Sequence, residues 1–139
     1  MRVYPLLLLV VAGCASTGNG SGEGSYSEPY GVIESGSPSA VRKEGRALIN
    51  RVDGRTPLNS RYGEVVKPGR RVVELNFSSG ESAGTNVKHS RTLELDVAPC
   101  TRYRIVAHYT SATHVDWEPV VYPEPIGECF ARFPAAKKP

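Results

Sequence analysis

The sequence has little of what marks the common functional classes of protein. Its 139 residues include only three cysteines, three histidines and one tryptophan, and the formal net charge is +3. Lys and Arg alternate with Asp and Glu along the chain, so no clustered basic surface is expected and we predict no nucleic-acid partner. With 40% hydrophobic and 22% charged residues, the composition indicates one modest globular domain.

Sequence motifs give little support for catalysis or metal binding. The chain contains no C-x-x-C or H-E-x-x-H pattern. Gly80-Glu81-Ser82-Ala83-Gly84 fits the letters of G-x-S-x-G, but we expect a hairpin loop around Ser79-Gly80 rather than the strand-to-helix elbow of a hydrolase, and therefore no catalytic triad. His108, His114 and Asp116 could together hold a metal or act as a general base, but they flank a turn rather than share one rigid element. We therefore expect surface histidines, no catalytic residue, no metal and no cofactor. A small periplasmic metal-binding protein or enzyme that uses these three residues is the alternative.

No apolar run is long enough to cross a bilayer, which takes roughly 20 residues as a helix. The longest run, residues 3–12, follows Arg2 and leads to the small residue Gly13. A positive start, a short apolar stretch and a small-residue end are typical of a secretory leader. Residues 1–13 are therefore predicted to be a signal peptide.

The residues that end this leader carry a specific motif. Val11-Ala12-Gly13-Cys14 closely resembles the lipobox of bacterial lipoproteins, in which a branched and two small residues precede an invariant Cys. The resemblance implies cleavage before Cys14 and lipidation of its sulfur, and each buried methylene of the lipid contributes about 0.8 kcal/mol to membrane binding. Ala15, in place of an Asp, implies the outer membrane, with the protein facing the periplasm. An ordinary secretory signal followed by an incidental Cys is the alternative.

The chain beyond the leader divides by composition. Residues 14–30 are rich in Gly and Ser with almost nothing apolar, so we predict a lipidated Cys followed by a flexible linker. Residues 31–133 carry short alternating segments separated by turns, which indicates a small antiparallel β-sandwich. Residues 134–139 are predicted to be a flexible tail.

Three segments alternate clearly between apolar and polar residues. They cover residues 71–77, 92–97 and 101–110, and their predicted inward side chains are Val73, Leu75, Phe77, Leu93, Leu95, Val97, Tyr103, Ile105, Ala107 and Tyr109. The last two segments are separated by a short break at Ala98-Pro99-Cys100, so we expect them to form a hairpin. In that hairpin Glu94 and Asp96 would lie across from Arg102 and Arg104.

Two further strands are predicted with less regular patterns. They cover residues 46–52 and 115–122, and residues 38–48 are expected to be strand or loop because Gly45 interrupts the apolar positions. Four aromatic residues could form a stacking patch for peptidoglycan sugars or peptides, but a core position is the more common role in a small domain. These residues are Tyr103, Tyr109, Trp117 and Tyr122.

The turns in the middle of the chain resemble those of a known family. Val52-Asp53-Gly54, then Thr56-Pro57, then Pro68-Gly69 leading into an alternating strand, resemble PEGA-like modules and small bacterial lipoproteins with prealbumin-like sandwiches. The resemblance spans roughly a third of the chain, ends near Phe77 and implies a small β-sandwich. Members of this class are often envelope-associated and seldom assigned a reaction, so the resemblance concerns architecture more than activity.

Two cysteines remain once Cys14 is lipidated. An even pair in an oxidising compartment is most simply a disulfide, here Cys100–Cys129. A pair of metal-binding or redox thiols is the competing interpretation. Together these patterns predict a non-enzymatic, lipid-anchored interaction module, attached to the membrane through Cys14, whose partner is an envelope protein or peptidoglycan.

Overall fold

The computed structural model describes residues 24–58, 63–78, 88–110 and 116–137. Eight strands, one short α-helix and one 3-10 helix occur in them: β1 (Gly31–Ser35), β2 (Glu44–Arg46), β3 (Leu48–Val52), β4 (Glu64–Val66), β5 (Gly69–Ser78), β6 (Lys88–Val97), β7 (Thr101–Tyr109), β8 (Trp117–Pro125), α1 (Gly127–Arg132) and η1 (Pro134–Ala136). The predicted mainly-β fold is confirmed. None of the helices in the described ranges is long and apolar enough to span a membrane.

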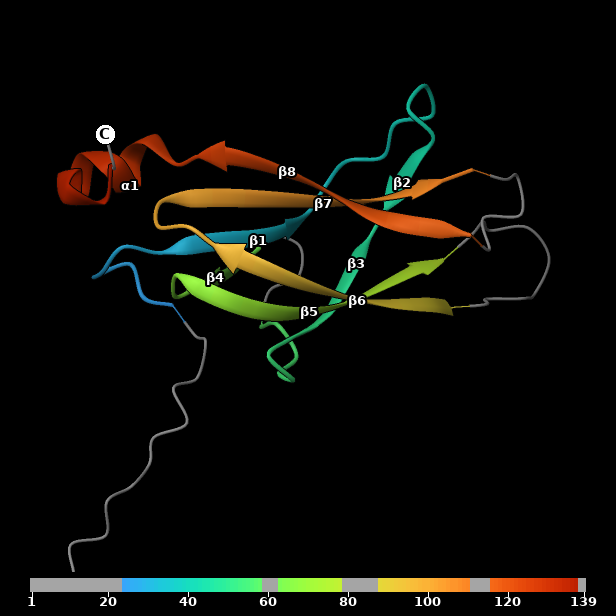
Figure 1. Cartoon of the computed structure of the whole chain (residues 1–139), viewed down its shortest axis with the longest axis horizontal. Coiled ribbons are helices and arrows are strands. Elements are labelled where there is room, and N and C mark those ends of the chain that lie inside the picture. The colour runs from blue at the N-terminus through green and yellow to red at the C-terminus, as the bar shows by residue number, and fades with distance from the viewer. Residues whose placement is uncertain (1–23, 59–62, 79–87, 111–115, 138–139) are drawn as a thin grey trace, which may run out of the picture.

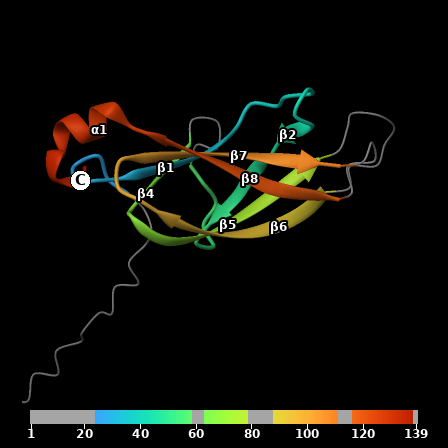
Figure 2. The same ribbon diagram turned by 45° about the horizontal axis from the view of Figure 1, so that its top comes forward.

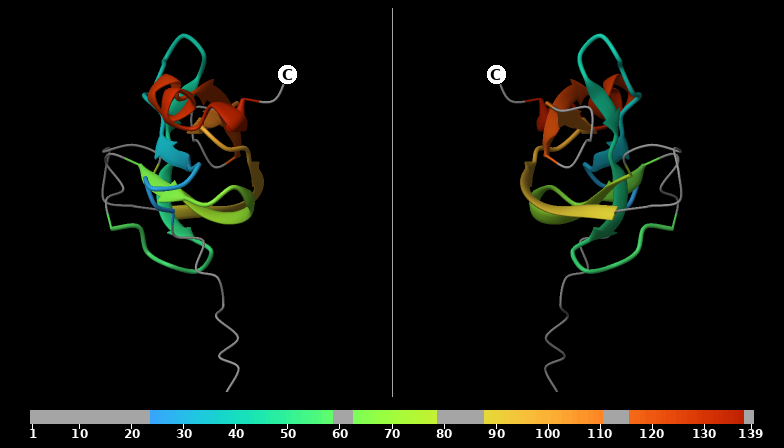
Figure 3. Two further views of the ribbon diagram at one scale, coloured as in Figure 1. Left: turned by 90° about the vertical axis from the view of Figure 1, so that its left-hand side faces the viewer. Right: turned by 90° about the vertical axis from the view of Figure 1, so that its right-hand side faces the viewer.

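The strands form two sheets that pack face to face. One has five strands, with β7 between β8 on one side and β1 and β2 on the other, and β4 beyond β1. The other has three strands in the order β3-β5-β6. The end views show the sheets as two layers, and Figure 1 shows α1 at one end of the long axis (Figures 1 and 3). The β1–β7 pair is parallel, so the predicted antiparallel sandwich contains one parallel pair.

The main core fills the space between the two layers. Its side chains come from the inward positions of both sheets, because successive residues of a strand point to opposite faces. The inward residues predicted for β5, β6 and β7 all belong to this core or pack against it. Trp117, at the start of β8, is only 2% exposed and packs edge-on against Phe77, which confirms it as a core anchor.

The predicted hairpin between residues 92–97 and 101–110 is wrong. β6 pairs with β5 along its whole length, and the chain then crosses to the other sheet, where β7 pairs with β8. In the structure the carboxylates of Glu94 and Asp96 face Arg70, with N–O distances of 3.7 and 3.6 Å. The strand alternation is the same for either neighbour, so it could not identify which strand β6 pairs with.

The predicted strand over residues 46–52 is divided between the sheets. β2 belongs to the five-stranded sheet and β3 to the three-stranded sheet, and the chain changes layer at the fully buried Ala47. The Ser35 hydroxyl donates to the Ala47 carbonyl oxygen at 2.6 Å and supports this crossing. A single run of apolar residues therefore contributes to both layers.

The predicted turns at Asp53-Gly54 and Pro68-Gly69 are present. Asp53 and Gly54 both have positive φ (51° and 77°), and Val52 and Arg55 exchange backbone hydrogen bonds across them. This is the conformation of the tight two-residue turns for which Asp-Gly is favoured. Gly69 has a φ of 113° and begins β5.

β8 extends beyond the predicted residues 115–122 and contains three prolines, Pro119, Pro123 and Pro125. In the described sheet β8 lies at the edge next to β7. The prolines occupy alternate positions, so their missing N–H groups fall on one edge of the strand. That edge must face away from β7, because β8 keeps its pairing with β7 along its whole length. On the outer edge the prolines also hinder the addition of a further strand.

A second, smaller apolar cluster lies beneath α1. Its buried residues are Tyr30, Val32, Cys100, Ile126 and Cys129, with Val65, Phe130, Phe133 and Ala136 packed against it. The packed domain therefore begins before the predicted bound at residue 31, because it includes Tyr30. It also extends beyond the predicted bound at residue 133 into the predicted tail, because Ala136 packs against it. Gly24, within the predicted linker, donates its backbone N–H to the Val65 carbonyl oxygen at 2.9 Å.

Candidate functional site

The outer face of the five-stranded sheet carries the most organised polar side chains in the described residues. On β7 the residues that alternate with the core positions are Arg102, Arg104, Val106 and His108, as the sequence predicted. β1 contributes Glu34 next to Arg104, and β8 contributes Glu124 opposite Arg102. We call the outer side chains of β1, β2, β7 and β8 the sheet face.

A chain of ion pairs crosses the sheet face near α1. The Arg104 guanidinium donates to Glu34 Oε1 at 2.9 Å through Nε and to Glu124 Oε1 at 2.8 Å through Nη1. The second oxygen of Glu34 lies 3.6 Å from Arg102 Nε. The hydrogen bond to Glu34 and the charge of Glu124 raise the pKa of Arg104. The arginine is thereby held between two carboxylates from strands on either side of it.

A buried carboxylate lies at the other end of the sheet face. The Glu44 side chain is 3% exposed, and its Oε2 accepts from Arg42 Nε at 2.8 Å. Its Oε1 accepts a hydrogen bond from the Tyr122 hydroxyl. This bond from Tyr122, together with Arg42, lowers the pKa of Glu44 although burial opposes the change. The same bond raises the pKa of Tyr122.

A hollow of about 380 Å³ lies between these two groups of charges. The strand register places Val106 between Tyr122 and Glu44, so the tyrosine ring must extend across the sheet over Val106 to reach the carboxylate. Val106 is accordingly 2% exposed. The hollow is lined by Gly36, Ser37, Arg42, Arg104, Val106, Tyr122 and Glu124.

Gly36 brings the chain after β1 close to this hollow. A Cβ at this position would lie 2.5 Å from Val106 Cγ1, which is closer than side chains tolerate. The Gly36 backbone N–H donates to the Ile105 carbonyl oxygen at 2.8 Å. The absence of a side chain thus allows the backbone to lie directly against β7 and form one wall of the hollow.

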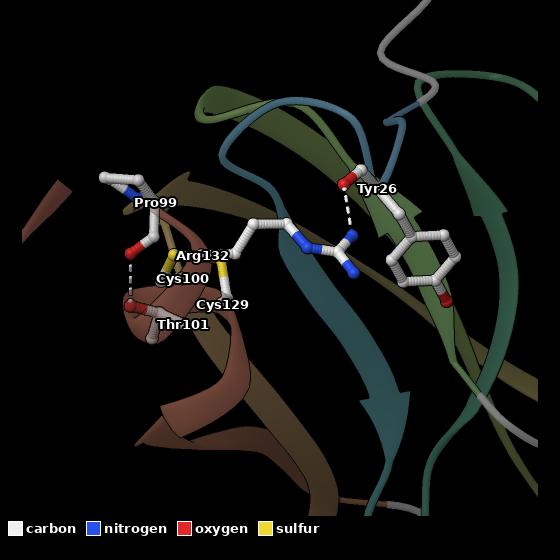
Figure 4. The surroundings of a disulfide bond; sticks show 6 residues. All are labelled: Tyr26, Pro99, Cys100, Thr101, Cys129 and Arg132. Atoms are coloured by element: carbon white, nitrogen blue, oxygen red, sulfur yellow. Dashed lines mark hydrogen bonds between the residues drawn. A yellow bond between two sulfur atoms is a disulfide. The ribbon is translucent and has the colours of Figure 1, made fainter. Parts of the chain in front are cut away.

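The Cys100–Cys129 pair is joined in the structure, as the sequence predicted, and it ties α1 to the turn before β7 (Figure 4). The Arg132 guanidinium, one turn beyond Cys129, donates to the Tyr26 carbonyl oxygen at 3.0 Å. A polar hollow of about 350 Å³ lies here, lined by Tyr26, Tyr30, Glu128, Cys129 and Arg132. The C-terminal segment is thereby joined to the turn before β7 by the disulfide and to Tyr26 by the Arg132 hydrogen bond.

Of the three residues in the alternative metal site, the structure describes His108 and Asp116. His108 lies on the sheet face between Glu44 and Glu118, and Asp116 is exposed just before β8. His114 and Cys14 lie outside the described residues. Within the described ranges, no three His, Cys, Asp or Glu side chains gather closely enough to hold a metal ion.

The four aromatic residues divide between core and surface. Tyr103 and Trp117 are buried in the main core, and Tyr109 packs against it. Tyr122 lies on the sheet face and is 38% exposed. The patch proposed as the rarer alternative is therefore absent among these residues, but one of its members lines the hollow.

Sequence reasoning found Arg102 and Arg104 as outward residues but missed their partners. Glu34 is 70 positions from Arg104, and Glu44 is 78 from Tyr122. No motif connects residues so far apart, and only the alternation of each strand could have suggested that they point outward.

The chain matches no protein-family model, no curated protein and no solved structure. The resemblance to PEGA-like modules therefore stays a prediction.

Proposed function

We propose that the protein is a lipid-anchored, non-enzymatic contact module of the bacterial cell envelope that binds its partner through the sheet face. The motif that ends at Cys14 supports the anchor, and Ala15 supports the outer membrane. The Cys100–Cys129 disulfide is the form expected in the oxidising periplasm.

The observation that carries this proposal is the network of arginines and glutamates on the sheet face. Exposed ion pairs contribute only about 0–1 kcal/mol each, so folding stability alone gives little reason to order them. Side chains already held in place lose less conformational entropy when a partner binds. Arg104, held by Glu34 and Glu124, and Arg42, held by Glu44, are prepared in this way.

The position of the tether is compatible with contact through this face. Gly24, the first described residue, is bound to β4, an edge strand of the five-stranded sheet (Figure 2). Gly24 lies ten positions after Cys14, and the predicted Gly- and Ser-rich linker between them would span about 17 Å. The body would therefore stay close to the membrane with the sheet face available to envelope components.

Photocrosslinking in cells tests the contact. A photoreactive residue at Val120 samples the sheet face, and one at Val72 samples the outside of the three-stranded sheet as a matched control. We expect adducts from position 120 and none from position 72. A discrete band would indicate an envelope protein, and material released by muramidase would indicate peptidoglycan. Equal adducts from both positions, or none from position 120, would contradict the proposal.

Lipid labelling tests the anchor separately. The wild-type chain should incorporate labelled palmitate and fractionate with the outer membrane, whereas Cys14→Ala should incorporate none and appear in the soluble periplasm. Cys100→Ala, which leaves Cys14 intact, is the control and should remain labelled. If Cys14→Ala still fractionates with the membrane as wild type does, the proposed lipid anchor is contradicted.

A further inference from the structure

We infer that the hollow on the sheet face binds a neutral oligosaccharide, with the ring of Tyr122 as its stacking surface. The inference rests on the proposed contact function and names the chemistry of the partner. It depends on three properties of the hollow: a fixed aromatic ring, a rim of planar polar groups, and a charge that is already balanced.

The first property is the position of the Tyr122 ring. Its hydroxyl is held by Glu44, and the register places the ring over the buried Val106. Tyr122 is nevertheless 38% exposed, and it lines the hollow. An aromatic ring presented in this way offers an apolar surface for the C–H groups of a sugar, with a polar edge beside it.

The second property is the rim of the hollow. Arg42, Arg104 and Glu124 have side chains that are 62%, 44% and 42% exposed. A guanidinium carries five N–H donors and a carboxylate accepts about four hydrogen bonds, so these groups keep bonding capacity beyond their mutual contacts. Planar groups of this kind match pairs of neighbouring hydroxyls, which both donate and accept.

The third property is charge balance. The ion pairs around the hollow join three arginines, Arg42, Arg102 and Arg104, to three glutamates, Glu34, Glu44 and Glu124. Arg46 and Glu118 add one further charge of each sign to the sheet face. A charged ligand inside the hollow would have to displace a partner of Arg42, Arg104 or Glu124 and leave another charge unpaired, which is costly. A neutral polyhydroxylated ligand can add hydrogen bonds to the intact pairs. The volume of about 380 Å³ lies within the usual range of small-ligand sites.

Chemical-shift mapping tests the inference on the full chain, kept in solution by Cys14→Ala. The probes are chitotetraose and maltotetraose, which are neutral, and a chondroitin sulfate tetrasaccharide, which is anionic. We expect saturable shifts of the Gly36, Val106 and Tyr122 amides with at least one neutral probe, with a dissociation constant of about 1 mM or below. No saturable shift with either neutral probe up to about 10 mM, or shifts only with the anionic one, would overturn the inference.

Variants of the ring provide the specificity control. Tyr122→Ala should weaken binding about tenfold, while Tyr122→Phe, which keeps the ring and loses its bond to Glu44, should weaken it less. Tyr26→Ala, which removes another exposed tyrosine distant from the hollow, should bind as wild type. If Tyr122→Ala does not fold, Tyr122→Leu and Tyr122→Phe supply the comparison. If a folded variant without the ring, Tyr122→Ala or Tyr122→Leu, binds the sugar as tightly as wild type, the inference is also overturned.

The two proposals can fail separately. Adducts from position 120 in cells without sugar binding in vitro would retain the contact function and reject the oligosaccharide. Sugar binding at the hollow without adducts would retain the ligand class and reject the envelope contact.

Discussion

Glu44 shows at the scale of a single residue how the sheet face is organised. In the described part of the chain it is the charged residue that the fold buries. Burial of a carboxylate is unfavourable unless partners compensate for lost water, and Arg42 and Tyr122 supply them. The carboxylate in turn sets the direction of the Tyr122 ring, so one buried charge determines the shape of the hollow.

The first prediction concerns Glu44→Gln. The pKa of Glu44 is lowered below its ordinary value of 4.5, so its contribution to stability is complete above about pH 4.5 and is lost as the pH falls through the lowered value. The amide retains the size and hydrogen-bonding capacity of the side chain but removes the charge. We expect Glu44→Gln to be less stable than wild type at pH 7, and the difference to shrink below pH 4.5.

Urea unfolding from neutral to acid pH measures this difference. Glu118→Gln, which removes an exposed carboxylate from the same face, is the control and should remain close to wild type throughout. A difference between Glu44→Gln and wild type that is the same at every pH would show that the charge is not responsible.

At the scale of an element, α1 depends on the disulfide. The helix has only six residues, which is too short to be stable by itself, and its buried residue is Cys129. The bond to Cys100 holds it against the second cluster, which also contains Tyr30 and Val32. Cys100 has a φ of 54°, a conformation that non-glycine residues rarely adopt, in the turn that leads into β7.

The second prediction concerns this bond. The two cysteines are 29 positions apart, and the chain-entropy model gives a stabilisation of about 3.6 kcal/mol for a loop of this size. We expect Cys100→Ala/Cys129→Ala to lower the free energy of unfolding by about this amount, measured by urea denaturation. Intact mass without reductant should show both thiols of the wild-type protein oxidised.

Reductant supplies the control for this experiment. It should destabilise the wild-type protein and leave the double variant unchanged, because the variant has no bond to reduce. Free thiols in exported wild-type protein, or equal stability of the two chains, would contradict the prediction.

At the scale of the whole molecule, the connection from β6 to β7 holds the two layers together. The chain leaves the three-stranded sheet at Val97 and enters the five-stranded sheet at Thr101. The Tyr103 hydroxyl accepts from the Ala98 backbone N–H at 2.8 Å and donates to the Asp96 carbonyl oxygen at 3.2 Å. A core residue of one layer thereby binds the end of a strand in the other.

The third prediction is that Tyr103→Phe destabilises the molecule by about 1–2 kcal/mol, since it removes two hydrogen bonds worth about 1 kcal/mol each. The ring itself stays in the core, so the packing is retained. Urea unfolding measures the change, and Tyr26→Phe, which removes the hydroxyl of an exposed ring, is the control. A loss no larger than that of the control would show that the crossing does not depend on the hydroxyl.

The residue pattern was enough to predict the strand character of this molecule, the inward faces of β5, β6 and β7, the turns at Asp53-Gly54 and Pro68-Gly69, and the pairing of Cys100 with Cys129. These features are local, or follow from residue types that have few alternatives. Alternation of apolar and polar residues shows which face of a strand is apolar, and it is the same whichever strand lies next to it.

Which strands are neighbours and which charges meet depends on how the whole chain packs. Glu94 and Asp96 complement Arg70 on β5 as well as they would have complemented Arg102 and Arg104, so charge did not distinguish the two pairings. The choice depends on how both layers cover the common core, to which every strand contributes at once. The buried Glu44 and the hollow beside it arise from the same packing, which joins segments that no local pattern connects.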